Sequence, residues 1–92
     1  MYAGGVLKRV NGLTYNKLLY FVRAGYLEPK KVKKKSLYYN DFSEEDVELI
    51  KRVWTFISKY NVGVRAAFER VKDEEKELQL RLNLKIRSNN SS

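Results

Sequence analysis

The sequence predicts a mainly α-helical fold with one small β-hairpin. Apolar residues recur at helical spacing in four separate segments. Between the second and third of these segments lies a lysine-rich stretch without helical period, which favours two short strands. The length of 92 residues suits a single small domain.

Two short helices joined by a tight turn are expected at the start of the chain. The first begins near Gly4 or Gly5 and should end at the pair Asn11 and Gly12. The apolar residues on one of its faces are Leu7, Val10 and Leu13.

A second helix is expected from about Tyr15. Thr14 is a suitable N-cap, because its hydroxyl can accept a hydrogen bond from an amide of the next turn. Gly25 stands where a left-handed residue commonly follows a helix. The inward residues are Leu18, Phe21 and Val22. Only about three residues separate the two helices, which is the spacing of a helix-turn-helix.

A two-stranded hairpin is the best fit to residues 26–40. The expected arms are Leu27 to Lys31 and Ser36 to Tyr39, and the tip carries Lys33, Lys34 and Lys35. Two helices, a hairpin and two further helices together describe a winged helix-turn-helix with four helices, in which the hairpin is the wing.

The third helix has the clearest signals. Ser43 is an N-cap followed by three acids, which the helix dipole favours in a first turn. Asn61 and Gly63 should end this helix. Its buried stripe is Val47, Ile50, Val53, Trp54 and Ile57. A fourth helix from about Val64 would bury Val64, Ala67, Phe68 and Val71.

The C-terminal segment gives conflicting signals. Strict alternation of apolar and polar residues is typical of an extra strand, whereas Leu, Gln, Arg and Lys individually favour a helix. The alternating apolar residues are Leu78, Leu80, Leu82, Leu84 and Ile86. In either form they predict an intermolecular contact. We therefore expect a domain over 1–75, an oligomerisation segment over 76–87 and a disordered tail over 88–92.

The composition argues against several classes of protein. The chain has no Cys and no His, so it offers no thiolate or imidazole to a metal and no thiol nucleophile. No pair of nucleophile and base can be proposed either. We expect no enzyme, no cofactor and no metal. No apolar run approaches the roughly 20 residues of a membrane span, so we expect no membrane partner and a cytoplasmic, nucleoid-associated protein.

Positive charge is concentrated in the N-terminal part. The net charge is +8. Residues 1–40 hold nine Lys or Arg against one acid, whereas residues 41–92 hold ten of each sign. A polarised excess is typical of a polyanion-binding surface, and it favours nucleic acid over an anionic membrane or an acidic protein.

A run of residues from Tyr2 to Pro29, YAGGVLKRVNGLTYNKLLYFVRAGYLEP, follows a known frame. The matching residues are Tyr2, Gly5, Leu7, Gly12, Leu13, Thr14, Leu18, Tyr20, Phe21, Gly25, Leu27 and Pro29. Together with FSEEDVELI further on, this run resembles the DNA-binding domain of the MerR family over roughly residues 2–73. The resemblance implies a winged helix-turn-helix that lays its second helix in the major groove of double-stranded DNA.

The chain departs from the family at three points. Leu19 stands where the family has an arginine, which moves a backbone contact to Lys17 and Arg23. The wing carries extra residues in YYND. Barely 20 residues follow the expected fourth helix, so the family's long dimerising helix and effector domain are expected to be absent, and ligand sensing is not expected.

The start of the second helix and the wing are the expected DNA contacts. Asn16 suits adenine, Lys17 guanine or a phosphate, and Tyr15 a sugar or a thymine methyl, although these positions can also be plain exposed residues. The resemblance places Tyr20 on the DNA backbone, and the wing lysines would add affinity without much sequence information. The expected set is Thr14, Tyr15, Asn16, Lys17, Tyr20, Arg23, Lys30, Lys31, Lys33, Lys34, Lys35 and Tyr38.

Three functions fit these expectations. The first is a sequence-specific transcription regulator of MerR type that acts as a homodimer. The second is an architectural, excisionase-like or segregation protein that binds DNA as a cooperative homo-oligomer. The third is a protein-interaction module whose basic wing meets an acidic partner. The family resemblance favours the first, and the expected absence of an effector domain favours the second.

Overall fold

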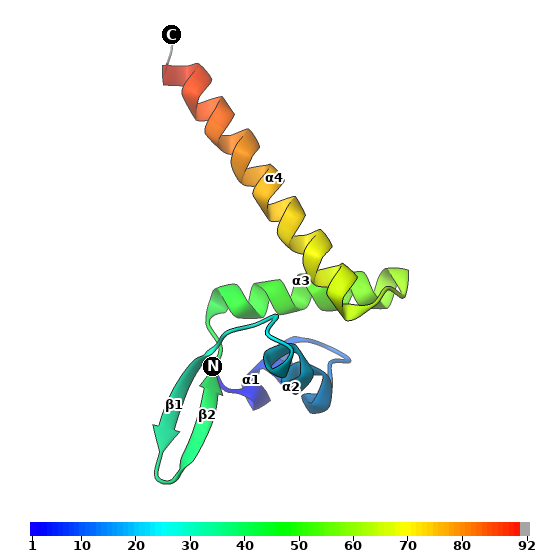
Figure 1. Ribbon diagram of the computed structural model, residues 1–92, viewed down its shortest axis with the longest axis vertical. Coiled ribbons are helices and arrows are strands. Elements are labelled where there is room, and N and C mark those ends of the chain that lie inside the picture. The colour runs from blue at the N-terminus through cyan, green and yellow to red at the C-terminus, as the bar shows by residue number, and fades with distance from the viewer. Residues whose placement is uncertain (91–92) are drawn as a thin grey trace.

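The computed structural model describes the backbone of residues 1–90 and the side chains of residues 1–82. Over this range the elements are α1 (Ala3–Arg9), α2 (Tyr15–Arg23), β1 (Lys30–Lys34), β2 (Leu37–Asp41), α3 (Glu44–Tyr60) and α4 (Val64–Asn90). The predicted mainly helical fold with one antiparallel hairpin is confirmed. Figure 1 shows α1, α2 and the hairpin on one side of α3, with α4 extending away from the other side.

A single apolar core joins all four helices. Its largest fully buried side chains are Val6, Leu18, Phe21, Val47, Ile50, Val53 and Phe68. Phe68 of α4 meets Phe21 of α2 edge to face, with 5.1 Å between the ring centroids. The same Phe68 ring stacks on Tyr26 at 4.8 Å. These aromatic contacts hold the first turns of α4 against α2.

Side-chain caps begin α2 and α3 where the sequence predicts them. The Thr14 hydroxyl accepts a hydrogen bond from the Lys17 amide at 3.2 Å. The Ser43 hydroxyl accepts from the Asp46 amide, and the Asp46 carboxylate accepts from the Ser43 amide, which completes a capping box. Each cap satisfies amides that have no partner inside the helix, so both helix starts are fixed by local chemistry.

The end of α2 is fixed by a glycine. Gly25 has a φ of +83°, as predicted for a residue that follows a helix. The amides of Gly25 and Tyr26 donate to the carbonyls of Val22 and Phe21, at 3.1 and 3.0 Å. This pattern is a Schellman motif, which ends the helix and redirects the chain towards β1.

The turn between α1 and α2 is held against α3. The Trp54 indole donates a hydrogen bond to the Asn11 carbonyl at 3.1 Å. Arg9 of α1 donates to both carboxylate oxygens of Glu44, at 2.9 and 3.0 Å. The hydrogen-bonded pair raises the pKa of Arg9 and lowers the pKa of Glu44. One acid of the first turn of α3 is thereby neutralised by α1.

The bounds of the hairpin differ from those predicted. Lys33 and Lys34 lie inside β1, and only Lys35 of the expected tip lies in the turn, with a φ of +58°. Leu27 is not in a strand but is buried in the core at 4% exposure. The prediction of an early first strand was wrong because the buried Leu27 anchors the chain to the helices before the strands pair.

The C-terminal segment is helical, so of the two forms that the sequence left open for residues 78–86 the helix is right and the extra strand is wrong. The fourth helix, α4, runs continuously through residues 64–90, so residues 88–90 of the expected disordered tail continue the helix. The side chains of Leu84 and Ile86, and the whole of residues 91–92, lie outside the described residues.

Helical propensity and charge pairing explain this outcome. Three ion pairs at a spacing of four residues bridge successive turns of α4: Arg65 with Glu69, Arg70 with Glu74, and Arg81 with Glu77. A strand would need a partner edge for its backbone groups, whereas a helix satisfies them internally. In the part of the chain that the structure describes, no helix is long and apolar enough to cross a membrane.

Substitution of two glycines by alanine should change stability in opposite directions. An added Cβ meets nothing within 4 Å at either Gly4 or Gly25. Gly25→Ala should therefore lower the free energy of unfolding by about 1 kcal/mol through its left-handed backbone alone. Gly4→Ala, inside α1, should raise it by about 0.5 to 1 kcal/mol. Urea unfolding followed by circular dichroism measures both, and equal effects of the same sign would contradict the assigned backbone at Gly25.

Candidate nucleic-acid interface

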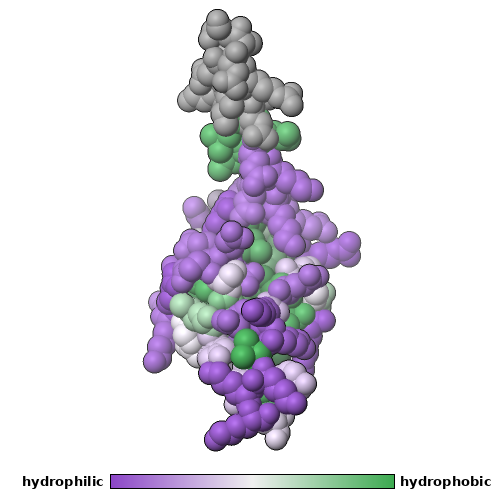
Figure 2. All heavy atoms as spheres, turned by 90° about the vertical axis from the view of Figure 1, so that its left-hand side faces the viewer, coloured by the Kyte–Doolittle hydropathy of each residue, from purple (hydrophilic) through white to green (hydrophobic). Residues whose placement is uncertain are grey.

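Seven of the nine basic residues of the N-terminal part lie on α2 and the hairpin, and the other two, Lys8 and Arg9, lie on α1. Those predicted to bind DNA are all exposed: Lys17, Arg23, Lys30, Lys31, Lys33, Lys34 and Lys35. Figure 2, which views the molecule from the hairpin side, shows hydrophilic side chains over much of the hairpin. Helix α2 and the hairpin, which carry these residues, lie on the same side of α3 (Figure 1).

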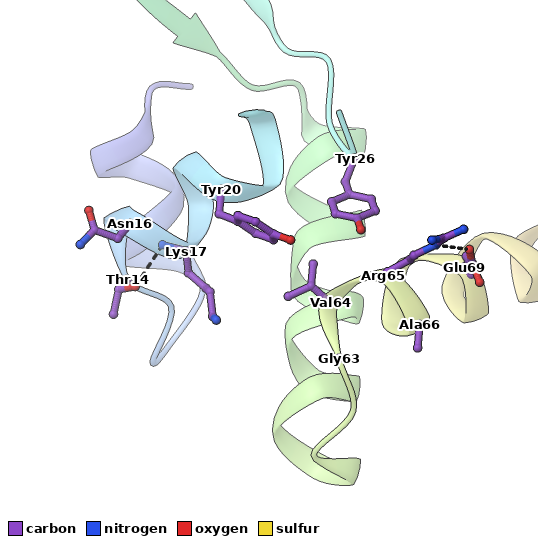
Figure 3. Close-up of a pocket in the computed structure, with 10 residues that line it drawn as sticks. All are labelled: Thr14, Asn16, Lys17, Tyr20, Tyr26, Gly63, Val64, Arg65, Ala66 and Glu69. Atoms are coloured by element: carbon purple, nitrogen blue, oxygen red, sulfur yellow. Dashed lines mark hydrogen bonds and ion pairs between the residues drawn. The ribbon is translucent and has the colours of Figure 1, made fainter. Parts of the chain in front are cut away.

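An open cleft of about 870 Å³ separates α2 from the start of α4. In Figure 3 the Tyr20 ring points across this cleft towards Tyr26 and Val64, while the amide of Asn16 points away from α4. The ring centroids of Tyr20 and Tyr26 are 6.4 Å apart. Lys17 also lines the cleft. Lys17 and Tyr20, both predicted to bind DNA, thus line the same cleft.

Arg65 is a cationic lining residue that the sequence pattern did not single out. It lies in the first turn of α4, and it donates a hydrogen bond to Glu69 at 3.1 Å (Figure 3). Residues 63–66 at the start of α4 also line the cleft, and the start of a helix carries positive potential. No short-range signal relates Arg65 to Lys17. They become neighbours of one cleft because Phe68, one turn further on, packs against α2.

Three of the residues predicted to bind DNA, Thr14, Tyr15 and Arg23, differ from Lys17 and Tyr20 in hydrogen bonding or in position. The Thr14 hydroxyl is engaged as the N-cap of α2. Tyr15 lies on the side of α2 that faces β2, away from Lys17 and Tyr20. Arg23 is exposed in the last turn of α2. The polar residues of α2 therefore divide between a surface near α4 and a surface near the hairpin.

The lysines of the hairpin divide between two faces. In the antiparallel register Lys33 is opposite Tyr38 and Val32 is opposite Tyr39. Since successive side chains of a strand alternate, Lys31 and Lys33 share one face, and Lys30 and Lys34 share the other. The hairpin is thus not a uniformly basic surface.

Two of these lysines lie on tyrosine rings. The Lys34 ammonium is 4.5 Å from the ring centroid of Tyr2, and a hydrogen bond with Tyr2 is the main cause that raises the pKa of Lys34. The Lys33 ammonium is 5.7 Å from the ring centroid of Tyr38. Lys34 therefore faces the body of the domain, unlike Lys31 and Lys33.

Two contacts near the first residue tie the hairpin to the helices. The Phe42 amide donates to the Met1 carbonyl at 2.7 Å, and the amino group of Met1 pairs with Asp41. The rings of Tyr2 and Tyr39 are 5.8 Å apart. These contacts hold the base of the hairpin, so its orientation relative to α2 is set by packing as well as by the connecting segment.

The predicted oligomerisation residues lie far from this surface on α4. Leu78, Leu80 and Leu82 are more than half exposed, at 58%, 63% and 51%. Figure 2 shows hydrophobic side chains on α4 next to its grey end. On a helix, Leu78 and Leu82 share a face, but Leu80 is turned by about 200° from Leu78. The alternating leucines therefore do not form one continuous stripe.

Comparison of the chain with protein families, with curated proteins and with solved structures finds no match. The function of this chain must therefore be argued from its own residues and geometry.

Proposed function

We propose that the protein is a sequence-specific double-stranded DNA-binding protein of winged helix-turn-helix type, acting as a transcription regulator similar to the MerR family. One observation supports this most directly. The polar start of α2 and the lysine-bearing hairpin lie on the same side of α3, while the long helix α4 leaves from the other side (Figure 1). Their spatial order fits a reading helix flanked by a wing.

In this proposal the first turn of α2 enters the major groove. Asn16 and Lys17 are exposed there, and the Asn16 amide points away from α4 in Figure 3. An amide can bond the edge of adenine in two places, and an ammonium can bond guanine acceptors. Asn16 is thus the residue proposed to read sequence, with Lys17 contacting either guanine or a phosphate.

The cleft between α2 and α4 is proposed to hold a DNA phosphate. It offers ammonium and guanidinium groups from Lys17 and Arg65, and phenol donors from Tyr20 and Tyr26. Charge-assisted bonds of this kind fix the register of a protein on the duplex without reading bases. Glu69 weakens the attraction of the cleft for a phosphate, because its carboxylate pairs with Arg65.

The hairpin tip supports contact with an anion. Lys35 has a left-handed backbone, which costs an L-residue about 1 to 2 kcal/mol relative to glycine. Asn or Gly would fill this position at lower cost. A lysine kept at the exposed tip at that cost is consistent with a task for its ammonium, and a phosphate is the partner we propose.

Alanine at Asn16 should relax sequence preference more than it weakens binding. Loss of a bidentate contact to a base costs about 1 to 3 kcal/mol at one position of the site, while phosphate contacts remain. Selection of bound duplexes from a random pool, with wild type and Asn16→Ala in parallel, measures the change. Gln79→Ala, at an exposed position inside α4, is the control. A preference unaltered by Asn16→Ala would exclude this residue as a reader.

Neutralising the outer hairpin lysines should weaken binding to every duplex alike. In the variant Lys31→Gln, Lys33→Gln, Lys35→Asn, the asparagine tolerates the left-handed turn. The slope of log affinity against log salt should become shallower by about 0.9 per lost contact, or up to about 2.7 in all. Titration of one duplex at several salt concentrations gives this slope.

The control variant removes equal charge from the other side of the molecule, by Lys51→Gln, Lys59→Gln, Lys76→Gln on α3 and α4. Its salt slope should match that of the wild type. Equal slopes for all three proteins would show that the hairpin does not contact the DNA backbone.

A second feature favours self-association. The exposed Leu78 and Leu82 continue the helical spacing of the buried Val71, beyond the core that covers Val71. We propose that a second copy covers this face, which gives a homodimer or a cooperative oligomer on DNA. Helix pairing rather than strand pairing is the form that α4 supports.

Leu78→Gln with Leu82→Gln should shift the protein towards a monomer, and Leu80→Gln should not, because Leu80 faces elsewhere on the helix. Sedimentation equilibrium measures the association constant, which should fall by at least about tenfold in the double variant. Equal loss in both variants would rule out a specific face. In footprints, protection that spreads with protein concentration would favour the architectural role over the regulator.

A further inference from the structure

A second cavity, of about 360 Å³, lies between the helix pair and the hairpin. Side chains of α2, the first residues of the chain and β2 form its wall, and it shares no lining residue with the cleft between α2 and α4. Its main lining side chains are Tyr2, Tyr15, Leu19, Val22, Tyr38 and Tyr39. It is also the more enclosed of the two.

The wall is suited to a flat apolar molecule. Leu19 and Val22 of α2 are only half-buried, although both are apolar, so their exposed faces are not covered by the core. Aromatic rings and aliphatic side chains around a few polar groups are typical of small-molecule sites. The polar groups here are phenol hydroxyls and the Asn40 side chain. The cavity therefore favours an aromatic body whose edge can form hydrogen bonds.

The charge around the cavity favours an anion. Lys34 lies 4.5 Å from the ring centroid of Tyr2, and Lys33 lies 5.7 Å from that of Tyr38, and both rings line the cavity. Among its lining residues, all of which the structure describes, there is no Asp or Glu. An anionic group held beside Tyr2 would lie near the Lys34 ammonium, which is outside the wall, and would meet no carboxylate of the wall itself; Asp41, which also acts on Lys34, is not a lining residue.

The size of the cavity limits the ligand. At about 30 Å³ for each water-sized group, 360 Å³ corresponds to roughly a dozen non-hydrogen atoms. This lies near the lower end of ligand pockets. One or two fused rings with a single carboxylate have this size.

We propose that the cavity binds a small aromatic carboxylate. The ligand lies between Leu19 and Val22 of α2 and the tyrosines of β2, with its carboxylate towards Lys34 beside Tyr2. Because it contacts both α2 and β2, it fixes the hairpin relative to the helix. Only this coupling rests on the proposed DNA binding; the binding of the ligand does not.

Calorimetric titration of the full chain without DNA tests the site, with 2-naphthoate as the probe. A ligand of about thirteen non-hydrogen atoms should bind one site with a dissociation constant of about 1 mM or tighter. The neutral 2-naphthylmethanol, of similar shape, should bind at least about threefold more weakly. Absence of saturable binding up to about 5 mM, or equal binding of both molecules, would overturn the proposal.

A variant whose cavity is filled by a larger side chain tests whether the ligand binds there. Leu19→Trp places an indole in the cavity and should weaken 2-naphthoate binding by at least about tenfold. Leu49→Trp makes the same change at a half-buried position of α3 outside the cavity, and should leave binding within about twofold. Circular dichroism confirms that both variants are folded. Unchanged affinity in folded Leu19→Trp would overturn the site.

The effect of the ligand on DNA binding is measured in a separate experiment. Saturating 2-naphthoate should change the affinity for a selected duplex by at least about threefold in wild type and not in Leu19→Trp. A protein that binds the probe but no duplex would overturn the proposed function and leave the ligand site intact. A protein that binds duplex but not the probe would overturn the ligand site alone.

Discussion

The contact of Phe68 with Phe21 and Tyr26 is the constraint on which the arrangement of this protein depends. It joins the last element of the chain to an early helix, with centroid distances of 5.1 and 4.8 Å. Truncation of a buried phenylalanine typically costs about 3 to 5 kcal/mol, a large part of the stability of a small domain. Without this contact, the cleft of Lys17 and Arg65 would lose its geometry.

Much of the fold could be predicted because its signals are local. Thr14, Gly25 and Ser43 act within one turn of their own position, and each makes the hydrogen bonds that its residue type and place indicate. The buried faces of the helices follow from spacing only in part. Val47, Ile50 and Val53 of α3 are buried as predicted. However, Val6 rather than the predicted Leu7 is the buried residue of α1, and the predicted Val22, Trp54, Ile57 and Val64 are only half-buried. The exposure of Lys17, Arg23 and the hairpin lysines follows from their charge, but the face that each lysine occupies follows only from the register of the hairpin, in which Lys30 is opposite Asp41.

What could not be predicted depends on pairing or on distance. The leucines of the C-terminal segment alternate as in a strand, but a strand there has no neighbour, so helical propensity and ion pairs such as Arg70 with Glu74 prevail. Which lysines share a face of the hairpin depends on the strand register, and the left-handed backbone of Lys35 in the turn fixes that register. Arg65 enters its cleft through packing of residues 47 positions apart, which no local pattern reports.

The unequal distribution of charge along the molecule affects its orientation during diffusion, before it contacts a partner. The end with α2 and the hairpin carries the excess of the +8 net charge, while the sequence of the remainder is balanced. In the field of a polyanion such a body experiences a torque during diffusion. The cationic end turns forward once within about 10 Å at 0.1 M salt, so a larger share of collisions is productive.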